Sequence, residues 1–489
     1  MHLCLVNPPE MPGFVSDRDK AGGVGVARPY QRRLWNRYCP PTPALDLLYA
    51  LALADRAGIP NRFVDAIARR WNARQTLAAI CETNPTHVGV RISLPSLKED
   101  LALANAVVTA LPRAQVFLFG ACAKMTHSRW LGQFRGDAVL YGEVEALLLA
   151  YLDGQAERAV LRPPQSATPA SWQTLENLDS LPFPAWHRVD RAAYTRRGHA
   201  DDFVYYVLTS RGCPKGCAMC PYFVYQGAEW RARSLDHLAA EFAHLANMGA
   251  RRVQTRDPNI SWRKPHLMAL AERLAGQRQL AITTETDLEA LNRQDLERLR
   301  EAGFVRIMTG VESVDETILR DIHQNGQALK RVLVNMQTCA ELGIAVTGFF
   351  IVGALTETWQ SIRQTIATAR TLPCEYSVSL MTPYPGTESR EAFIKAGYHR
   401  EGDFRDYNGY TGLVRTSGLD HQQVVLAHAW ASAELELVQR RRGLHWRHWW
   451  QTLRYLAQRH RVTRLRRRIK QVESLAPATT HREELPLGA

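Results

Sequence analysis

Short apolar runs alternate with longer amphipathic stretches over the first 154 residues. The runs have the length of buried β-strands, and the stretches between them have the period of helices. The series reads LCLV, PALDLLYALALADRAG, RFVDA, HVGVRIS, a helical stretch over 96–111, QVFLFGA and DAVLYGEVE. Strand and helix in alternation indicate a parallel sheet with helices on both faces, so we predict a Rossmann-like α/β domain over residues 1–154.

A proline-rich stretch interrupts this rhythm over residues 155–200. It contains the segments RPPQSATPAS and LPFPAW, whose prolines and small polar residues oppose regular structure. We therefore predict a connector that crosses the protein surface between two domains.

A second alternating series occupies residues 201–400. It contains six strand candidates, each followed by a helical stretch: FVYYVLTS, RRVQTR, LAITTE, VRIMTGVES, AVTGFFIVG and YSVSLMTPYPG. We predict a partial (β/α)6 barrel of the TIM type, although the period of the apolar positions does not distinguish it from a second doubly wound sheet. Residues 401–470 then predict a helical extension, and the composition of residues 471–489 is typical of a disordered tail.

The composition is that of a soluble protein with two or three domains. Of the 489 residues, 46% are hydrophobic and 22% are charged, and no apolar run approaches the ~18 residues of a membrane span. The opening run LCLV ends at NPPEMPG, without the layout of a signal peptide. We therefore expect a cytoplasmic protein, in which the nine cysteines favour metal or redox chemistry over a disulfide framework.

The net charge of +13 comes from one segment near the C-terminus. Residues 438–470 hold twelve Arg and Lys and no acidic residue, which leaves 49 basic and 48 acidic residues in the rest of the chain. At 100° per residue, an apolar arc lines one side of the helix expected here. The arc consists of Trp446, Trp449, Trp450, Leu453, Leu456 and Ala457, with Arg447, Arg454 and Arg461 along its edge.

Three interpretations of this basic helix stay open. Aromatic side chains beside arginines suit a helix that lies on an anionic membrane surface. The same charge suits nucleic-acid phosphates, an interpretation that we favour less. In the third interpretation the tryptophan face packs against the rest of the protein and the arginines are merely solvated.

Three cysteines lie close together in the segment RGCPKGCAMCPYF. Cys213, Cys217 and Cys220 have CxxxCxxC spacing and follow the first strand of the second series, where barrels of this type place their chemistry. Three thiolates can bind three irons of a [4Fe-4S] cluster and leave the fourth iron open to a small molecule. A zinc site needs four ligands, and the sequence offers no second CxxC pair and only His199, fourteen residues upstream.

This cysteine loop resembles that of the radical S-adenosylmethionine (SAM) superfamily, and the resemblance continues along the barrel. The segment GFFIVGALTET at 348–358 is similar to the family's fifth-strand motif, with Gly353 and Glu357 in place. GVES at 310–313 resembles the end of the fourth strand, and PYPGTE at 383–388 resembles the sixth.

The resemblance implies reductive cleavage of SAM to a 5'-deoxyadenosyl radical that removes hydrogen from an unactivated carbon. No side-chain base is then required, and the barrel positions SAM and excludes water. Met219 stands where the family usually has an aromatic residue, and QTRDPNI replaces the family's GGE at the second strand. The residues implied to bind SAM are Met219, Asp257, Glu312, Ser313 and Gly353.

The N-terminal segments resemble the cobalamin-binding domain that precedes the barrel in one large radical SAM class. LVNPP, PTPALDLLYALALADRAG, VDA, GVRISLPS, FLFGA and DAVLYGEVEALL, followed by LDSLPFPAW, occur in the same order. A parallel sheet binds a flat cofactor at the carboxyl ends of its strands. The positions implied to bind cobalamin are Asn7, Pro8, Ser93, Gly120, Gly142 and Glu143. A domain that keeps the fold without the cofactor is the alternative.

A literal copy of DxHxxG, the motif that supplies a cobalt-ligating histidine in another cobalamin family, occurs as DIHQNG at 321–326. It lies within the barrel rather than after the first strand of the N-terminal domain. We interpret this copy as coincidental and set His323 aside. Any cobalamin bound here is then expected to lack a histidine ligand on its lower face.

These resemblances predict a cobalamin-dependent radical SAM enzyme that methylates an unactivated carbon or phosphorus centre, or one that forms or rearranges a ring. The implied partners are a small-molecule or lipid-like substrate, a reductant protein such as flavodoxin or ferredoxin, and the inner membrane surface for residues 438–470. The second hypothesis is a radical SAM methylthiotransferase acting on RNA or protein, in which Cys4, Cys39 and Cys81 would hold a second cluster. A zinc-stapled nucleic-acid-binding protein is the third.

Overall fold

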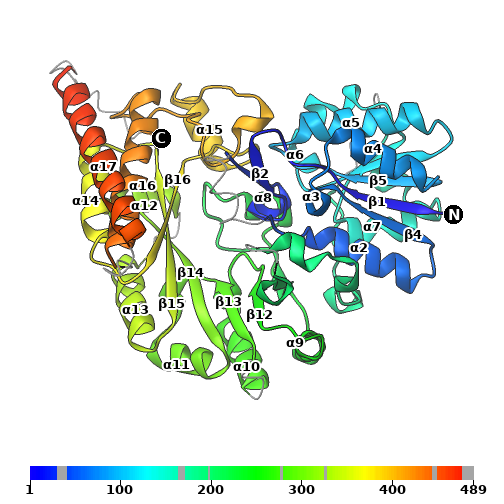
Figure 1. The fold of residues 1–489 in the computed structure, drawn as a ribbon, viewed down its shortest axis with the longest axis horizontal. Helices are drawn as coiled ribbons and strands as arrows, with labels where there is room; N and C mark the ends of the chain where they lie inside the picture. Colours follow the sequence, from blue (N-terminus) through cyan, green and yellow to red (C-terminus); the bar gives the residue numbers. More distant parts are fainter. Residues whose placement is uncertain are drawn as a thin grey trace, which may run out of the picture.

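The computed structural model describes residues 1–29, 41–163, 171–195, 199–275, 279–323, 328–442 and 449–475. Two α/β domains lie side by side, and a helical C-terminal part covers the second domain on the side away from the first (Figure 1). The predicted fold class is therefore confirmed.

A six-stranded sheet forms the centre of the N-terminal domain. Its strand order is β4-β1-β5-β6-β7-β8, with parallel pairing from β4 to β7 and an antiparallel β8 at the edge. The strands are β1 (Leu3–Asn7), β4 (Asn61–Asp65), β5 (His87–Arg91), β6 (Gln115–Phe119), β7 (Ala138–Leu140) and β8 (Val160–Leu161).

Helices cover both faces of this sheet because its strands are apolar on both sides. Leu3 and Leu5 of β1 point into one core, and Cys4 and Val6 point into the other, as the alternation of side chains along a strand requires. The helices of the first core are α2 (Leu45–Arg56) and α7 (Val144–Leu152), and those of the second are α4 (Ala73–Glu82) and α5 (Leu97–Ala110). Two shorter helices are α3 (Ala66–Arg69) and α6 (Ala123–Thr126).

A hairpin that the apolar pattern did not predict follows β1. It consists of β2 (Phe14–Asp17) and β3 (Val26–Pro29), joined by a turn with a short 3-10 helix, η1 (Ala21–Gly23). The turn reaches the second domain, since a Cβ on Gly22 would lie 3.1 Å from the Cα of Tyr222 in α8 (Pro221–Gln226). The hairpin turn therefore links the two domains.

The connector over 155–200 is more buried than the sequence predicted. It contributes β8 to the first sheet, and its Trp186 and Tyr194 are buried in the core. The Trp186 ring packs edge-on against Phe203 and Tyr205, with ring centroids 5.8 Å and 5.2 Å away. The prediction of a segment that merely crosses the surface is wrong for this part, because Trp186 of LPFPAW packs against the first strand of the barrel.

The second domain is an open, parallel six-stranded barrel segment. Its strand order is β9-β12-β13-β14-β15-β16. The strands are β9 (Val204–Val207), β12 (Arg252–Thr255), β13 (Ala281–Glu285), β14 (Phe304–Glu312), β15 (Ala345–Val352) and β16 (Glu375–Leu380), with a small antiparallel pair β10 (Ser210–Arg211) and β11 (Arg231–Ala232).

Helices surround the outer face of the barrel strands. Several begin at residues that cap the free backbone N–H groups of the first turn: Ser234, Asn292 and Thr358 accept from the third helical residue. The helices are α9 (Leu235–Asn247), α10 (Lys264–Leu274), α11 (Arg293–Glu301), α12 (Glu316–Ile322), α13 (Leu329–Glu341), α14 (Trp359–Ala369) and α15 (Glu388–Lys395).

Two long helices form the C-terminal part. α16 (His421–Arg442) packs on β16 and α14, and α17 (Trp449–Leu475) packs on α16. α17 continues through residues 471–475, which the sequence assigned to a disordered tail, whereas residues 476–489 lie outside the described residues. No helix in the described ranges combines the length and the apolar character that crossing a membrane requires.

Candidate active site

The cysteine loop leaves the barrel at the carboxyl end of β9. Gly212 has φ +81°, and a Cβ there would collide with the carbonyl oxygen of Glu229, so the chain can turn into the loop only at a glycine. The Cys213 N–H donates to the Gly227 carbonyl at 3.1 Å, and the Ala218 N–H donates to Ile322 at the end of α12 at 3.0 Å. The loop is therefore held from both sides.

The three thiols of this loop suit metal binding. Burial raises the pKa of Cys217 to about 11, an effect that Lys215 opposes and the neighbouring Cys213 reinforces. Burial also raises the pKa of Cys213 and Cys220. Such thiols keep their protons at neutral pH until iron displaces them, so cluster binding would release protons. Within the described ranges, no three Cys, His, Asp or Glu side chains are arranged to share a single metal ion.

A cavity of about 350 Å³ opens in front of the three cysteines. Its wall is mainly apolar and aromatic, with a few charged groups from different barrel strands. Its apolar and aromatic lining residues include Tyr222, Phe349, Ile351, Leu380, Met381, Tyr384 and Tyr410, and its polar ones include Lys215, Glu285, Asp287, Glu312 and His323.

Of the residues predicted to bind SAM, Met219 and Glu312 line this cavity. Glu312 has φ +59°, a left-handed conformation that costs a non-glycine residue about 1–3 kcal/mol. Its Oε2 is buried without a hydrogen-bond partner among the described residues. Burial, and then the charge of Glu285, raise the pKa of Glu312 to about 8. A strained carboxyl group with a free oxygen suits a cationic or hydrogen-donating ligand.

The other three predicted SAM residues do not line the cavity. Asp257 accepts hydrogen bonds from the hydroxyls of Thr209 and Ser210, both at 2.7 Å, and so fastens the end of β12 to the start of the cysteine loop. The Ser313 hydroxyl lies 3.2 Å from that of Thr365. A direct contact of these residues with SAM stays a prediction, and the structure gives them supporting positions.

Gly353 lies outside the wall of the cavity and stabilises the end of β15. Its N–H donates to the Glu357 carboxylate at 2.7 Å, and Ser361 donates to the same carboxylate at 3.3 Å. Burial raises the pKa of Glu357 to about 7. The pairing of Gly353 with Glu357 seen in the sequence is thus a loop clasp at the end of β15.

His323 lies in this cavity, although the sequence analysis set it aside. Its Nδ1 is 3.3 Å from Sγ of Cys217, and its side chain is buried. The histidine of the DxHxxG copy therefore lies beside the cysteine loop, and the interpretation of that copy as a coincidental match to the cobalamin motif stays a prediction. No sequence signal indicated the contact with Cys217, because the two residues are 106 positions apart.

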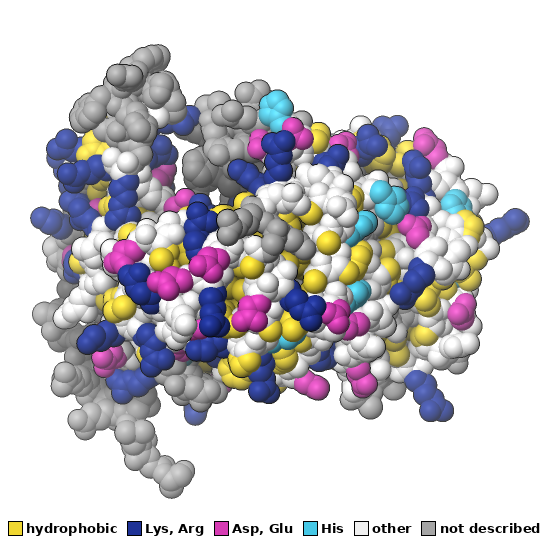
Figure 2. Space-filling model, turned by 90° about the horizontal axis from the view of Figure 1, so that it is seen from below, with side chains coloured by type: hydrophobic (Ala, Val, Ile, Leu, Met, Phe, Trp, Pro, Cys, Tyr) yellow, Lys and Arg dark blue, Asp and Glu magenta, His cyan; other side chains and the backbone are white. Residues whose placement is uncertain are grey.

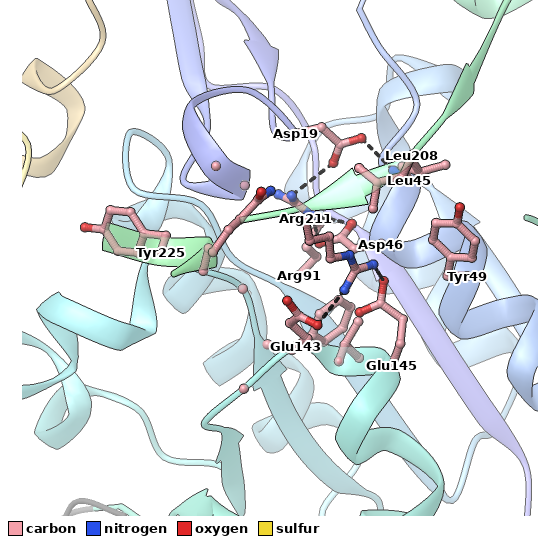
Figure 3. Close-up of a pocket in the computed structure, with 18 of the residues that line it drawn as sticks. Asp19, Leu45, Asp46, Tyr49, Arg91, Glu143, Glu145, Leu208, Arg211 and Tyr225 are labelled. Carbon is pink, nitrogen blue, oxygen red and sulfur yellow. Dashed lines mark hydrogen bonds and ion pairs between the residues drawn. The ribbon is translucent and has the colours of Figure 1, made fainter. Parts of the chain in front are cut away.

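A second, smaller cavity lies at the carboxyl edge of the N-terminal sheet, where it faces the barrel. Its volume is about 110 Å³. The predicted residues Gly120, Gly142 and Glu143 line it, together with Tyr49, Arg91 and Arg211 (Figure 3). Within the described part of the chain, Nη1 of Arg91 and the Tyr49 hydroxyl are buried without a hydrogen-bond partner. Such buried donors indicate a binding site for acceptor groups.

Asn7, Pro8 and Ser93 are absent from the wall of this second cavity. The Asn7 amide donates to Asp65 at 3.0 Å, and the Pro8 carbonyl accepts from Arg18 at 3.4 Å. The Ser93 hydroxyl accepts from Arg18 at 2.9 Å. Binding of cobalamin by these three residues stays a prediction. Their hydrogen bonds connect the loops at the carboxyl ends of the strands to one another.

Arg211 lines the second cavity and lies next to the cysteine loop along the chain, and no pattern in the sequence indicated this role. It lies in β10, directly before the cysteine loop, and forms ion pairs of 2.7 Å with both Glu143 and Glu145 of the N-terminal domain (Figure 3). Burial opposes ionisation of Glu143, but Arg211, Arg231 and the Leu175 N–H outweigh it and hold the pKa of Glu143 at about 2. This buried network fixes the cysteine loop to the edge of the first sheet.

Of the three cysteines proposed for a second cluster, the structure describes two. Cys4 is fully buried within the core of the first sheet, and burial raises its pKa to about 12. Cys81 lies in α4, and Cys39 lies outside the described residues. This placement weighs against the methylthiotransferase hypothesis.

Residues 207–369 match the model of the radical SAM superfamily. An uncharacterized methyltransferase of Pyrococcus horikoshii is 24% identical over 402 residues, which are 78% of this chain and 85% of that protein. Hopanoid C-3 methylase of Methylococcus capsulatus is 25% identical over 318 residues, which are 60% of this chain and 58% of that protein.

Two solved structures share the fold. TsrM, a radical SAM methyltransferase from Kitasatospora setae, is 17% identical with a TM-score of 0.60, and the match covers 82% of this chain and 77% of TsrM. OxsB, a cobalamin-dependent radical SAM enzyme whose structure contains aqua-cobalamin, is 12% identical with a TM-score of 0.68, over 89% of this chain and 67% of OxsB. At these identities the likeness establishes the arrangement of the domains.

Proposed function

Because the chain belongs to the radical SAM superfamily and folds like its cobalamin-dependent enzymes, we propose that it methylates an unactivated centre of a small-molecule substrate, with SAM as the methyl donor. The observation that carries this proposal is the cavity of about 350 Å³ whose wall contains the three cysteines and Glu312, the Oε2 of which has no hydrogen-bond partner among the described residues. Such a cavity has room for a small molecule, with metal ligands on one side and a polar anchor on the other.

The cysteine thiolates would hold a [4Fe-4S] cluster, which supplies the electron that cleaves SAM. Glu312 would bind the amino group of SAM, and Met219 would pack beside the cluster. The aromatic wall excludes water from the cavity, which protects a reactive radical from side reactions. The glutamate clasp on Gly353 keeps the end of β15 in place.

The residues at the second cavity suit the amide-rich rim of cobalamin, which supplies a carrier for the methyl group. Gly120 and Gly142 line this cavity, and a Cβ on either would collide with the carbonyl oxygen of Ile92 or Gln173, so close backbone packing requires glycine at both positions. Arg91 and Tyr49 offer unpaired donors among the described residues. The cavity of about 110 Å³ is smaller than the ~300–1,000 Å³ of typical ligand sites, so binding of cobalamin would require this edge of the domain to open.

The overall reaction balances with two molecules of SAM and two electrons from a reductant protein such as flavodoxin or ferredoxin. One SAM loses its methyl group and becomes S-adenosylhomocysteine. The second SAM takes up one electron and one substrate hydrogen atom and yields methionine and 5'-deoxyadenosine. The other electron would be needed to regenerate a cobalamin held at the second cavity after it gives up the methyl group. Cyclisation or rearrangement would form no S-adenosylhomocysteine, so the two products separate these reactions.

Anaerobically reconstituted protein, incubated with SAM, hydroxocobalamin and a reductant, is expected to form both 5'-deoxyadenosine and S-adenosylhomocysteine. Chromatography of the products measures each compound, and omission of hydroxocobalamin should remove the S-adenosylhomocysteine. Formation of 5'-deoxyadenosine alone in the presence of substrate would contradict methylation and favour cyclisation or rearrangement. Absence of both products from protein with full iron and sulfide content would refute the proposal.

The apolar part of the cavity wall supports a lipid-like substrate. It contains Phe349, Ile351, Leu380 and Met381, and the wall also carries the charged groups Lys215, Glu285, Asp287 and Glu312. A named hopanoid methylase is among the relatives. SAM with a deuterated methyl group, added with a hopanoid-containing bacterial lipid extract, should place the label in the lipid fraction.

The surface of α17 supports attachment to an anionic membrane. Leu453 and Leu456 are 55% and 48% exposed, while Val462 and Ile469 are buried against the neighbouring helix. Arg461 is exposed on the same helix. Figure 2 shows basic side chains with apolar ones among them at the end of the molecule where Figure 1 places α17.

The packing interpretation is therefore wrong for Leu453 and Leu456. Of the expected arc, Trp446 and its neighbour Arg447 lie outside the described residues, and the side chains of Trp449 and Trp450 are not described. Exposed leucines beside arginines suit the boundary between lipid headgroups and acyl chains, and nucleic-acid phosphates offer no partner for the leucines.

The double variant Leu453→Glu, Leu456→Glu is expected to bind vesicles of phosphatidylcholine and phosphatidylglycerol at least about tenfold more weakly than the unaltered protein, because burying one leucine contributes about 1.5–3 kcal/mol. Cosedimentation at two salt concentrations measures the binding. Val334→Glu is a matched control, since Val334 is 55% exposed on α13. Equal binding by the double variant, or binding to RNA but not to vesicles, would contradict membrane attachment.

A further inference from the structure

The end of α12 is built onto the cysteine loop. The carbonyl oxygen of Ile322, the last residue of that helix, accepts the N–H of Ala218, which lies between Cys217 and Cys220. The N–H of His323 in turn bonds to Leu319 at 2.8 Å and continues the helical pattern by one residue. These bonds fix the backbone of His323 relative to the cysteines, independently of its side chain.

The side chain of His323 is aimed at one sulfur atom. Nδ1 is 3.3 Å from Sγ of Cys217, within hydrogen-bonding distance for sulfur, and only 6% of the residue is exposed. Nε2 is buried without a hydrogen-bond partner among the described residues. Because Nδ1 faces the sulfur, it is the nitrogen that can donate a proton to a thiolate.

We propose that His323 donates a hydrogen bond from Nδ1–H to the Cys217 thiolate of the bound [4Fe-4S] cluster and thereby raises the reduction potential of the cluster. The proposal rests on the proposed function in one respect, the presence of that cluster. Reduction adds negative charge to the cluster and its sulfur atoms. A donor to a ligating sulfur stabilises the reduced form more than the oxidised form, and hydrogen bonds to the sulfurs are among the factors that set cluster potentials.

His323 is thus a positioning and tuning residue rather than a ligand. With His323 in place, a weaker reductant would reduce the cluster. This matters for an enzyme whose first chemical step is transfer of one electron into SAM, because the reduced fraction of the cluster limits that step.

The test is a redox titration of the reconstituted cluster, followed by electron paramagnetic resonance in the absence of SAM and cobalamin. Iron and sulfide content and the spectrum of the reduced cluster are measured first in every protein. His323→Phe removes both nitrogens at similar volume, and His323→Asn keeps an N–H near the position of Nδ1. His266→Phe is the matched control, because His266 lies in α10 against Trp230 and does not line the cavity in front of the cysteines.

At the midpoint potential of the unaltered protein, the ratio of reduced to oxidised cluster is expected to fall about tenfold in His323→Phe, which is 59 mV for one electron. His323→Asn should recover at least half of that shift, and His266→Phe should match the unaltered protein. An unchanged potential in a fully loaded His323→Phe protein overturns this proposal and leaves the proposed function standing. Unaltered protein without a [4Fe-4S] spectrum overturns both.

A measurement on the unaltered protein covers the case in which the variants fail to hold a cluster. Protein labelled with ¹⁵N-histidine should show weak coupling between one histidine nitrogen and the reduced cluster, as expected across a hydrogen bond. Strong coupling would show that His323 is an iron ligand. Absence of coupling would show that His323 makes no hydrogen bond to the cluster. Either result overturns the proposal.

Discussion

Cys217→Ala is expected to bind less than a full complement of iron and to lose formation of 5'-deoxyadenosine. The variant removes one of three thiolates, so the remaining Cys213 and Cys220 can hold only two irons of the cluster. Removing a residue that only hydrogen-bonds to a metal ligand already lowers metal affinity or activity about 10–100-fold. Loss of a ligand itself should lower them further. Iron and sulfide analysis and chromatography of the nucleoside products measure the two effects.

A matched control separates cluster loss from general damage to the barrel. Cys374 is also a buried, unpaired cysteine of this domain, but it lies just before β16 and does not line the cavity. Cys374→Ala should keep its iron and its products. Full iron content together with undiminished 5'-deoxyadenosine in Cys217→Ala would show that the three cysteines are not the cluster ligands.

The sequence was sufficient for the regular elements of both domains, because their apolar periods are long and unbroken. β1 has apolar residues on both faces and lies between β4 and β5 in a sheet with helices on both sides, as predicted. The hairpin of β2 and β3 was missed because its segment is rich in glycine and proline and has no clear period. Trp186 was missed because a proline-rich segment predicts exposure, although one aromatic residue within it packs into the core.

The candidate site was predictable only where chemistry follows spacing along the chain. The three cysteines are local, so their spacing was informative. His323 and Cys217 are 106 residues apart, and Arg211 reaches Glu145 across 66 positions. No local pattern encodes such contacts, since they depend on which strand ends the fold brings together. Asp257 shows the converse: it ends a strand as expected, yet its carboxylate bonds to Thr209 and Ser210 instead of lining the cavity.

Arg211→Ala is expected to destabilise the protein by about 3–5 kcal/mol at pH 7, because it leaves Glu145 buried without its cation. Glu143 keeps Arg231 at 2.8 Å, so the larger loss falls on Glu145. The urea midpoint measures the change. Arg188→Ala breaks a half-exposed ion pair with Asp55 and should cost no more than about 1 kcal/mol.

The difference in stability between Arg211→Ala and the unaltered protein depends on pH through both carboxylates. Burial raises the pKa of Glu145 and Arg211 opposes that rise, so losing Arg211 destabilises the charged Glu145 most at neutral pH, with the same sign as the effect at Glu143. The pKa of Glu143 is lowered from 4.5 to about 2 in the folded protein, so it stabilises the fold above pH 4.5, and this contribution is lost as the pH falls through 2. Without Arg211 the pKa of Glu143 rises towards its ordinary value and less of that stabilisation remains. The difference in the free energy of unfolding between Arg211→Ala and the unaltered protein should therefore be largest at neutral pH and should narrow below pH 4.5. A difference that widens in acid would contradict the assignment.

The same variant tests the link between the two cavities. Arg211 directly precedes Gly212 and the cysteine loop, while its partners Glu143 and Glu145 lie at the edge of the N-terminal sheet. Arg211→Ala should therefore weaken hydroxocobalamin binding and iron loading together, under conditions where the protein is still folded. Arg211→Lys keeps the charge, but an ammonium group pairs with both carboxylates less well than the planar guanidinium. Its binding of hydroxocobalamin and iron should therefore lie between that of the unaltered protein and that of Arg211→Ala. Loss of only one of the two cofactors would show that this ion pair serves one cavity and does not couple them.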